Sequence, residues 1–501
     1  MSSAENSLNP LLAAASRLRL SLRPNARFLS FNLWLIPICV IGLIIVISDG
    51  VSRPLNVEML DVAIEPLTYQ PYQGAFVFAL FMLPLVLCYA SSARTSKAEA
   101  LLLWFVLCTV AYTKDFSYIG IPGTKLFVTE VVLAVLVLSQ ATALAKSLPC
   151  LGRFTMWALL GLFSAGGLAA VRGLLSSQDK MLVARDSVIV VYALFLPLGF
   201  LLISSWERAR RFFLFFALGA IFASLNALAW FLAQPGQRRY IEYGTYVLVC
   251  FVGGVVLTTN RLIQPAIGWL LSGLLFVGIL LANARTIYAA LALALLVVMV
   301  VSPSARLRLS ARTLKRMVGV SVVLICILWV FSQSKVGADF IESAGAELVS
   351  GTVNYSDDVN ANFRFLAWLE AIQRFAAQPL AGEGYGIPFE FELSNLDPRP
   401  HNTYLTILYK MGVLGFLPLT LILASFYWKG WKSLRLLRGG SDSLLLYIVL
   451  VSQLVMSAYG LLNLLLESPF LASIYWLILG AGIRMMFLSR VSNEGRQLFT
   501  G

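Results

Sequence analysis

Long apolar runs alternate with short polar segments along almost the whole chain. A helix needs about 20 mostly apolar residues to cross a bilayer, and most of the runs approach that length. The pattern predicts an all-α, polytopic membrane helix bundle of about fourteen spans; twelve stays open, because some runs are short and two could be re-entrant. The predicted spans are residues 31–48, 72–90, 99–113, 125–145, 154–171, 182–203, 212–233, 244–259, 266–282, 286–301, 317–332, 402–427, 444–463 and 469–488.

Composition excludes the soluble classes of protein. Of 501 residues, 59% are hydrophobic and 13% are charged, whereas a soluble domain carries about 25% charged residues. The net charge of +13 does not predict a nucleic-acid partner, because the basic residues stand in short segments between apolar runs. Their expected partners are anionic membrane lipids and, at a few positions, a phosphorylated substrate. The six cysteines have no metal-ligand spacing, so neither a zinc site nor a disulfide is predicted.

The basic segments also predict the topology. Lys and Arg concentrate before the first span, in alternate loops and after the last span, and the positive-inside trend places all of these segments, with both termini, in the cytoplasm. The resulting divisions are a cytoplasmic N-terminal tail (1–30), a transmembrane bundle (31–333), a periplasmic loop (334–401), C-terminal transmembrane helices (402–488) and a cytoplasmic tail (489–501).

The long outer loop is the one stretch with enough polar residues to form structure outside the bilayer. Within residues 362–377, apolar side chains recur at helical spacing, and Glu370 and Arg374 form an i, i+4 pair. This predicts an amphipathic helix against the outer membrane face. Pro379 ends it, and the glycines within residues 382–386 predict a tight, irregular turn.

The single histidine, His401, lies where this loop enters the next span. Pro400 suits the first turn of a helix, which predicts His401 at a helix N-terminus near Arg399. The helix dipole and a nearby cation both disfavour imidazolium, and a neutral His401 can accept a proton as a general base does. A purely structural histidine remains the alternative.

Four outer arginines are not explained by the positive-inside trend. Arg285 interrupts two long apolar runs, Arg364 begins the amphipathic helix, and Arg238 and Arg239 are adjacent. The planar guanidinium suits a phosphate. Snorkelling to lipid headgroups remains open for Arg285, and a solvated position on the polar helix face remains open for Arg364.

Ionisable residues also occur in or beside apolar runs. Glu130, Arg185 and Asp186 do so, and such residues pair with other helices or mark a substrate path. Arg185 and Asp186 are predicted to find separate partners between helices, and each is a candidate for that path.

Three segments, taken in order, resemble the O-antigen ligase and polymerase superfamily. They are Asn-Ala-Arg-Thr at 283–286; Asn-Phe-Arg-Phe-Leu-Ala-Trp at 362–368, running on to the glycines of 382–386; and His-Asn-Thr-Tyr-Leu at 401–405, continuing to Gly-Val-Leu-Gly at 412–415. The order and topology match the family: an arginine outside one span, then a long periplasmic loop with a second arginine, ending in His-Asn. Two positions depart from its pattern: Ala284, where the family often has serine, and Lys410, where it often has an acidic residue.

The resemblance implies a GT-C-like, metal-independent, inverting glycosyltransferase without a cofactor, working at the periplasmic face of the bacterial inner membrane. Its donor would be a glycan on undecaprenyl pyrophosphate. We expect Arg285 and Arg364 to hold the pyrophosphate and His401 to accept or orient the acceptor's proton. Further substrate contacts are expected from Arg238, Arg239, Arg399, Asn402 and Tyr404.

The sequence favours a polymerase of O-antigen or exopolysaccharide, for which a chain-length regulator is a candidate partner. A ligase that transfers the glycan to lipid A-core is the close alternative, and a lipid-linked oligosaccharide flippase is a more remote one. Many transporters have midplane sites, whereas the candidate residues here gather at one membrane face. A membrane scaffold without activity would leave the outer arginines unexplained.

Overall fold

The computed structural model describes residues 32–52, 73–121, 126–176, 179–234, 243–282, 284–300, 359–394, 399–437 and 440–498. Within these ranges the regular structure is helical, apart from one isolated bridge between Gly120 and Phe127, which confirms the all-α class. The helices are α2 (Leu35–Ser52), α3 (Gln73–Ser92), α4 (Lys97–Tyr112), α5 (Lys114–Ser117), α6 (Val128–Ser139), α7 (Ala141–Ser147), η3 (Leu148–Leu151), α8 (Arg153–Ser176), α9 (Lys180–Val191), η4 (Tyr192–Leu194), α10 (Phe195–Leu202), α11 (Trp206–Ala233), α12 (Tyr243–Thr259), α13 (Pro265–Ala282), α14 (Arg285–Val300), α17 (Val359–Ala377), α18 (Thr403–Leu436), α19 (Ser441–Tyr459) and α20 (Pro469–Leu498).

Nine membrane spans pass by length and apolarity among the described residues, or ten if the bent pair α6–α7 is one span. This confirms a multi-pass membrane protein. The count is below the predicted twelve to fourteen for three reasons. Helices α4, α12 and α14 are short, the run 125–145 is broken by a 75° bend, and the predicted span 317–332 lies outside the described residues.

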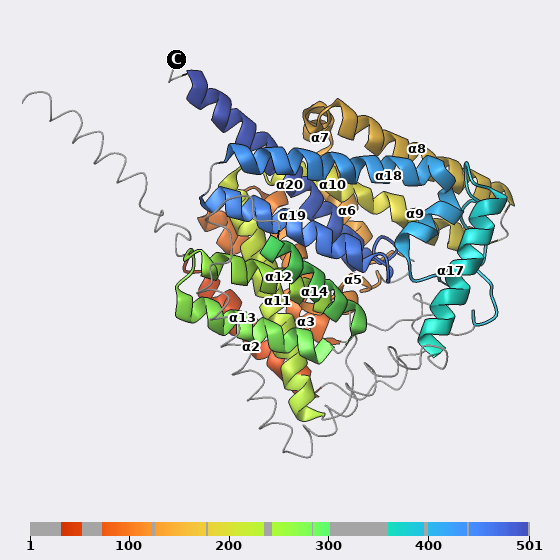
Figure 1. Cartoon of the computed structure of the whole chain (residues 1–501). Helices are drawn as coiled ribbons and strands as arrows, with labels where there is room; N and C mark the ends of the chain where they lie inside the picture. Colours follow the sequence, from red (N-terminus) through yellow and green to blue (C-terminus); the bar gives the residue numbers. More distant parts are fainter. Residues whose placement is uncertain are drawn as a thin grey trace, which may run out of the picture.

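Burial separates the centre of the bundle from its rim. In α20, 83% of the apolar window is buried, against 28% in α2. On α2, Ile36, Val40 and Ile44 are exposed at i, i+4 spacing, as on a helix face that meets lipid. Figure 1 shows α18, α19 and α20 running lengthwise through the molecule, with α17 lying crosswise at one end.

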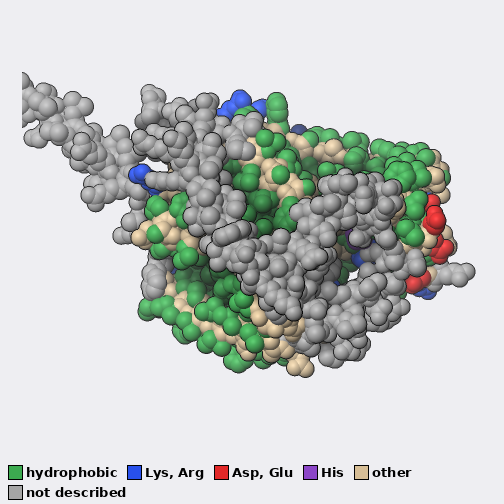
Figure 2. Space-filling view, turned by 60° about the horizontal axis from the view of Figure 1, so that its bottom comes forward, with side chains coloured by type: hydrophobic (Ala, Val, Ile, Leu, Met, Phe, Trp, Pro, Cys, Tyr) green, Lys and Arg blue, Asp and Glu red, His purple; other side chains and the backbone are tan. Residues whose placement is uncertain are grey.

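The opposite end gathers basic segments that are far apart in the sequence. Arg208 at the start of α11 lies 3.2 Å from Glu99 at the start of α4, and Arg210 lies 2.5 Å from Asp442 at the start of α19. Three segments that the charge pattern assigned to one side of the membrane therefore meet in space. On the face shown in Figure 2, the visible Asp and Glu side chains gather at the other end, which α17 forms in Figure 1.

The amphipathic helix is confirmed as α17, which includes the whole predicted range. Its i, i+4 pair forms with 2.6 Å between Arg374 Nε and Glu370 Oε1. Phe365, Leu369 and Ile372 are 57%, 43% and 49% exposed. Among the described residues this apolar face is uncovered, as suits a helix that rests on a membrane surface.

Candidate active site

A break in α18 creates the backbone framework of the site. Gly412 has φ 62° and ψ −161° inside the helix, so neighbouring backbone groups lose their helical partners. The segment after α17 supplies new ones: Val413 N donates to Pro379 O (2.9 Å) and Gly384 N donates to Lys410 O (3.0 Å). A helix can break at membrane depth only where protein satisfies the freed groups, and this segment does so.

The predicted glycine turn is confirmed by three left-handed residues, Gly382, Gly384 and Gly386, with φ of 64°, 100° and 80°. Helix α8 contacts the turn through Arg172, whose guanidinium donates a hydrogen bond of 2.5 Å to Gly382 O. On α9, the Asp186 carboxylate accepts a hydrogen bond of 2.9 Å from Gly386 N. The turn thereby links α8 and α9 to the break in α18.

Replacing Gly412 with alanine should destabilise this framework. A Cβ at Gly412 would lie 2.4 Å from the carbonyl carbon of Leu380, and a left-handed non-glycine residue costs roughly 1–3 kcal/mol even without a clash. We expect a fall of several degrees in the melting temperature of detergent-solubilised protein. Gly167→Ala on α8 is the matched control, because its Cβ meets nothing within 4 Å; equal melting of the two variants would contradict this account.

A buried ion pair joins α18 to α9. Lys410 Nζ lies 2.5 Å from Asp186 Oδ1, and the two side chains are 9% and 10% exposed. The prediction that Asp186 has a partner on another helix is thus confirmed. That partner, Lys410, is one of the two positions at which the sequence departs from the family pattern.

The turn that carries His401 differs in one respect from the prediction. Helix α18 begins at Thr403, and Asn402 is its N-cap, accepting hydrogen bonds of 3.1 Å from the amides of Tyr404 and Leu405. Pro400 and His401 therefore precede the helix, and placing Pro400 in its first turn was wrong. An asparagine side chain caps the free amides better than the preceding residues can, and His401 adopts a left-handed φ of 49°.

The loop between α19 and α20 is hydrogen-bonded to the residue that follows this turn, Thr403. Thr403 Oγ1 accepts hydrogen bonds from the amides of Leu465 (2.7 Å) and Leu466 (3.3 Å) and lies 3.2 Å from Glu467 Oε2. Burial raises the pKa of the Glu467 carboxyl above its ordinary value, while hydrogen bonds from two threonines and the nearby charges of Arg399 and Lys410 act to lower it. These contacts fix the start of α18, and the turn before it, to the loop between α19 and α20.

Helix α17 holds the same turn from the other direction. The ring of Phe363 packs edge-on against that of His401 at 5.6 Å between centroids, and Trp368 Nε1 donates to Pro400 O at 2.8 Å. Arg364, next to Phe363, is half-buried. Helix α17, which carries Arg364, therefore packs against the turn that carries His401.

Arg285 opens α14 at this same end. Tyr447 Oη of α19 donates to Val297 O of α14, and twelve residues separate Arg285 from Val297 just as twelve separate Tyr447 from Tyr459. Because the two helices run in opposite directions, both steps of about 18 Å lead toward the same end of the bundle. Arg285 thus lies toward the end of the bundle at which α19 ends with Tyr459, and the carbonyl of the next residue, Gly460, accepts the amide of Thr403.

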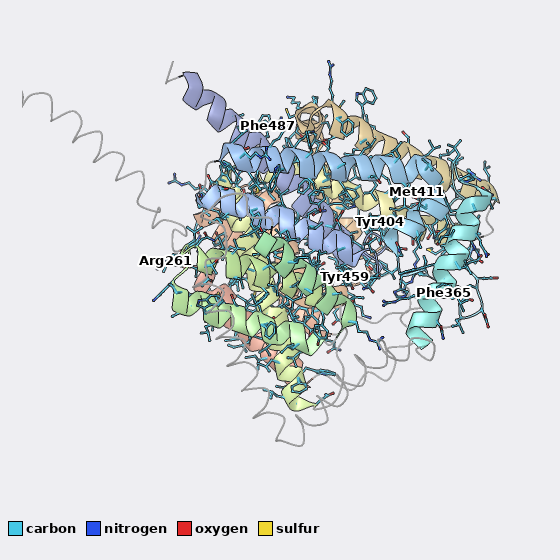
Figure 3. The ribbon with its side chains drawn as sticks, in the orientation of Figure 1. Arg261, Phe365, Tyr404, Met411, Tyr459 and Phe487 are labelled. Carbon is cyan, nitrogen blue, oxygen red and sulfur yellow. The ribbon has the colours of Figure 1, made fainter. Side chains whose placement is uncertain are left out.

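Figure 3 labels side chains of three of these helices. Phe365 of α17 lies at one end and Arg261 at the other, and Tyr404 of α18 and Tyr459 of α19 lie between them. Tyr404 Oη also donates to Ser457 O at 2.9 Å, so this predicted substrate residue has a structural partner. The predicted residues Arg238 and Arg239 lie outside the described residues.

A cavity of about 510 Å³ opens beside the turn, between α6, α9, residues 387–394, Arg399 and α18. Of the predicted substrate residues, Arg399 lines it; so do Glu130, Arg185 and Asp186, which the sequence marked as candidates for a substrate path. Across the described ranges, no three His, Cys, Asp or Glu side chains could together hold a metal ion.

Sequence reasoning missed Glu467, which lines the cavity and bonds to Thr403. A signal for it exists: it is a lone carboxylate between two apolar runs, a costly position that usually marks a partner or a function. Lys410 was noticed only as an exception to a family pattern, and its partner could not be derived from spacing along the chain.

The fold defines a polytopic α-helical membrane protein in which the turn bearing His401 lies between α17 and the α19–α20 loop. The sequence profile of a family described as "O-Antigen ligase" matches residues 270–421, a range that includes all three motifs. A curated "O-antigen ligase" of Pseudomonas aeruginosa is 37% identical over 78 residues, which are 15% of this chain and 20% of that protein. The matched segment thus spans a fifth of the relative's length. Together the matches confirm, over this part of the chain, the similarity to the O-antigen ligase and polymerase superfamily.

Proposed function

We propose that this protein is a membrane glycosyltransferase that moves a glycan from undecaprenyl pyrophosphate to an acceptor hydroxyl at the periplasmic face of the bacterial inner membrane. One observation carries the proposal. The turn bearing His401 is fixed between α17 and the α19–α20 loop, at the end of the bundle where Arg364 and Arg285 also lie. A histidine and fixed guanidinium groups are the chemistry that this transfer needs.

The reaction assigns a role to each residue. The acceptor oxygen attacks the anomeric carbon while the bond from that carbon to the pyrophosphate oxygen breaks. Arg285 and Arg364 stabilise the charge that develops on the departing diphosphate, worth on the order of a few kcal/mol each in a partly dehydrated site. His401 takes the proton of the acceptor hydroxyl, and Asn402 supports the turn through its cap.

We favour a polymerase, whose acceptor is another lipid-linked repeat unit. A ligase is the second candidate, and a specific observation supports it: both the matching family and the Pseudomonas aeruginosa relative carry the description O-antigen ligase. The lipid-linked donor and the reacting groups are the same in both.

Reconstitution separates the two candidates. Purified protein in lipid vesicles, given only lipid-linked repeat units from cells that lack it, should produce a ladder of longer glycans on gels. A ligase would produce no ladder and would transfer the glycan only after lipid A-core is added. Absence of transfer under both conditions would overturn the proposed function.

A further inference from the structure

The cavity beside the turn is chemically distinct from the His401 side. Arg399 lines it, whereas the ring of His401 packs against Phe363 of α17. The cavity wall continues along α9, where Met181, Leu182 and Ala184 are exposed or half-exposed. A ligand of this cavity therefore lies next to the turn without replacing the groups assigned to the diphosphate.

Charge argues against a phosphate in this cavity. Three cations, Arg185, Arg399 and Lys410, face it together with four carboxylates. Lys410 is paired with Asp186 at 2.5 Å, and the charge of Arg399 acts on Glu467. Lys410 and Arg399 are thus already engaged by carboxyl groups of the cavity rather than available to a polyanion, while the paired groups present hydrogen-bond donors and acceptors to a neutral ligand.

The remaining wall is apolar and aromatic. Rings of Tyr118, Phe127, Phe389 and Tyr409 line the cavity beside the aliphatic face of α9. Aromatic faces suit the C–H faces of a sugar ring, and the polar groups suit its hydroxyls. Pockets of this size, mostly apolar with a few convergent polar groups, hold small organic ligands.

We infer that this cavity is the acceptor site and binds the terminal sugar residues of the acceptor glycan through their hydroxyls and C–H faces. The assignment rests on the proposed sugar transfer in its polymerase form, in which the acceptor glycan is a lipid-linked repeat unit. Arg399 stands two residues before His401, so their Cα atoms are at most about 7 Å apart. A sugar held against Arg399 thus lies within reach of the proton acceptor, while the diphosphate occupies the arginines of α14 and α17.

The test uses the full-length protein and oligosaccharide released by mild acid from the lipid-linked repeat units, which carries neither lipid nor diphosphate. The released oligosaccharide should bind the wild-type protein in calorimetry, and Arg185→Gln should weaken binding at least tenfold. Ala184→Trp should abolish binding by filling the cavity, and it removes no contact of the fold because Ala184 is exposed. Lys180→Gln is the matched control, since Lys180 is exposed at the start of α9 and is not part of the lining.

Two further measurements distinguish a wrong acceptor site from a wrong transfer mechanism. His401→Ala should bind the oligosaccharide as wild type does, so loss of transfer with retained binding supports both assignments. Inorganic pyrophosphate should not displace the oligosaccharide; displacement would make the cavity a phosphate site and overturn the inference. Absence of oligosaccharide binding to wild type, or unchanged binding in Ala184→Trp, would also overturn it, while leaving the roles of Arg285 and His401 to be judged by transfer alone.

Discussion

His401→Ala and Arg285→Ala should each abolish detectable glycan transfer while the protein remains in the membrane at wild-type abundance. Loss of a general base lowers a rate by about 10²–10⁴-fold. Loss of a guanidinium that stabilises developing charge costs about 10²–10³-fold. Both effects follow from positions at the same end of the bundle, near α17 and the start of α18. Glycan length on gels, in cells and in vesicles, is the measurement.

The control is Arg261→Ala, which removes the same side chain at the opposite end of the molecule, in the turn before α13. Its transfer should equal that of wild type. Arg285→Lys should retain part of the activity, because the charge remains while the planar fork is lost. Glycans of normal length in His401→Ala or Arg285→Ala would refute the proposed mechanism.

Lys410→Ala should be the most destabilising single substitution among those considered. It leaves Asp186 buried at 10% side-chain exposure without its cation, and breaking one side of a buried pair costs about 3–5 kcal/mol. Because Asp186 also accepts Gly386 N, we expect the glycine turn to loosen as well. Thermal unfolding in detergent measures the loss.

A double variant tests the cause. Asp186→Asn together with Lys410→Met removes both charges and should recover most of the stability, since an uncharged pair carries no unpaired buried ion. Glu370→Ala is a comparison at the more exposed pair with Arg374, whose side chains are 28% and 18% exposed; there about 1 kcal/mol or less is expected, because Arg374 keeps Glu383 as a second partner. A Lys410→Ala protein as stable as Glu370→Ala would show that the buried pair does not hold α9 to α18.

Much of the architecture could be derived from local pattern. Apolar runs of spanning length predicted the helices, the spacing within 362–377 predicted α17, and three glycines predicted a tight turn, which the structure shows to be left-handed at each of them. Each of these features depends on residues within a few positions of one another. Bends and short helices were less predictable, because a continuous apolar run does not reveal that α6 and α7 meet at 75°.

The candidate site divides in the same way. The sequence by itself determined which side chains are costly where they stand: Arg285, Asp186 and His401 each interrupt or border an apolar run. Only the tertiary structure decided their neighbours. It paired Asp186 with Lys410 across 224 positions (410 − 186), and it set Phe363 against His401. The physical reason is that desolvation penalises an isolated charge wherever it lies in the chain, whereas the partner that offsets the penalty depends on how the helices pack.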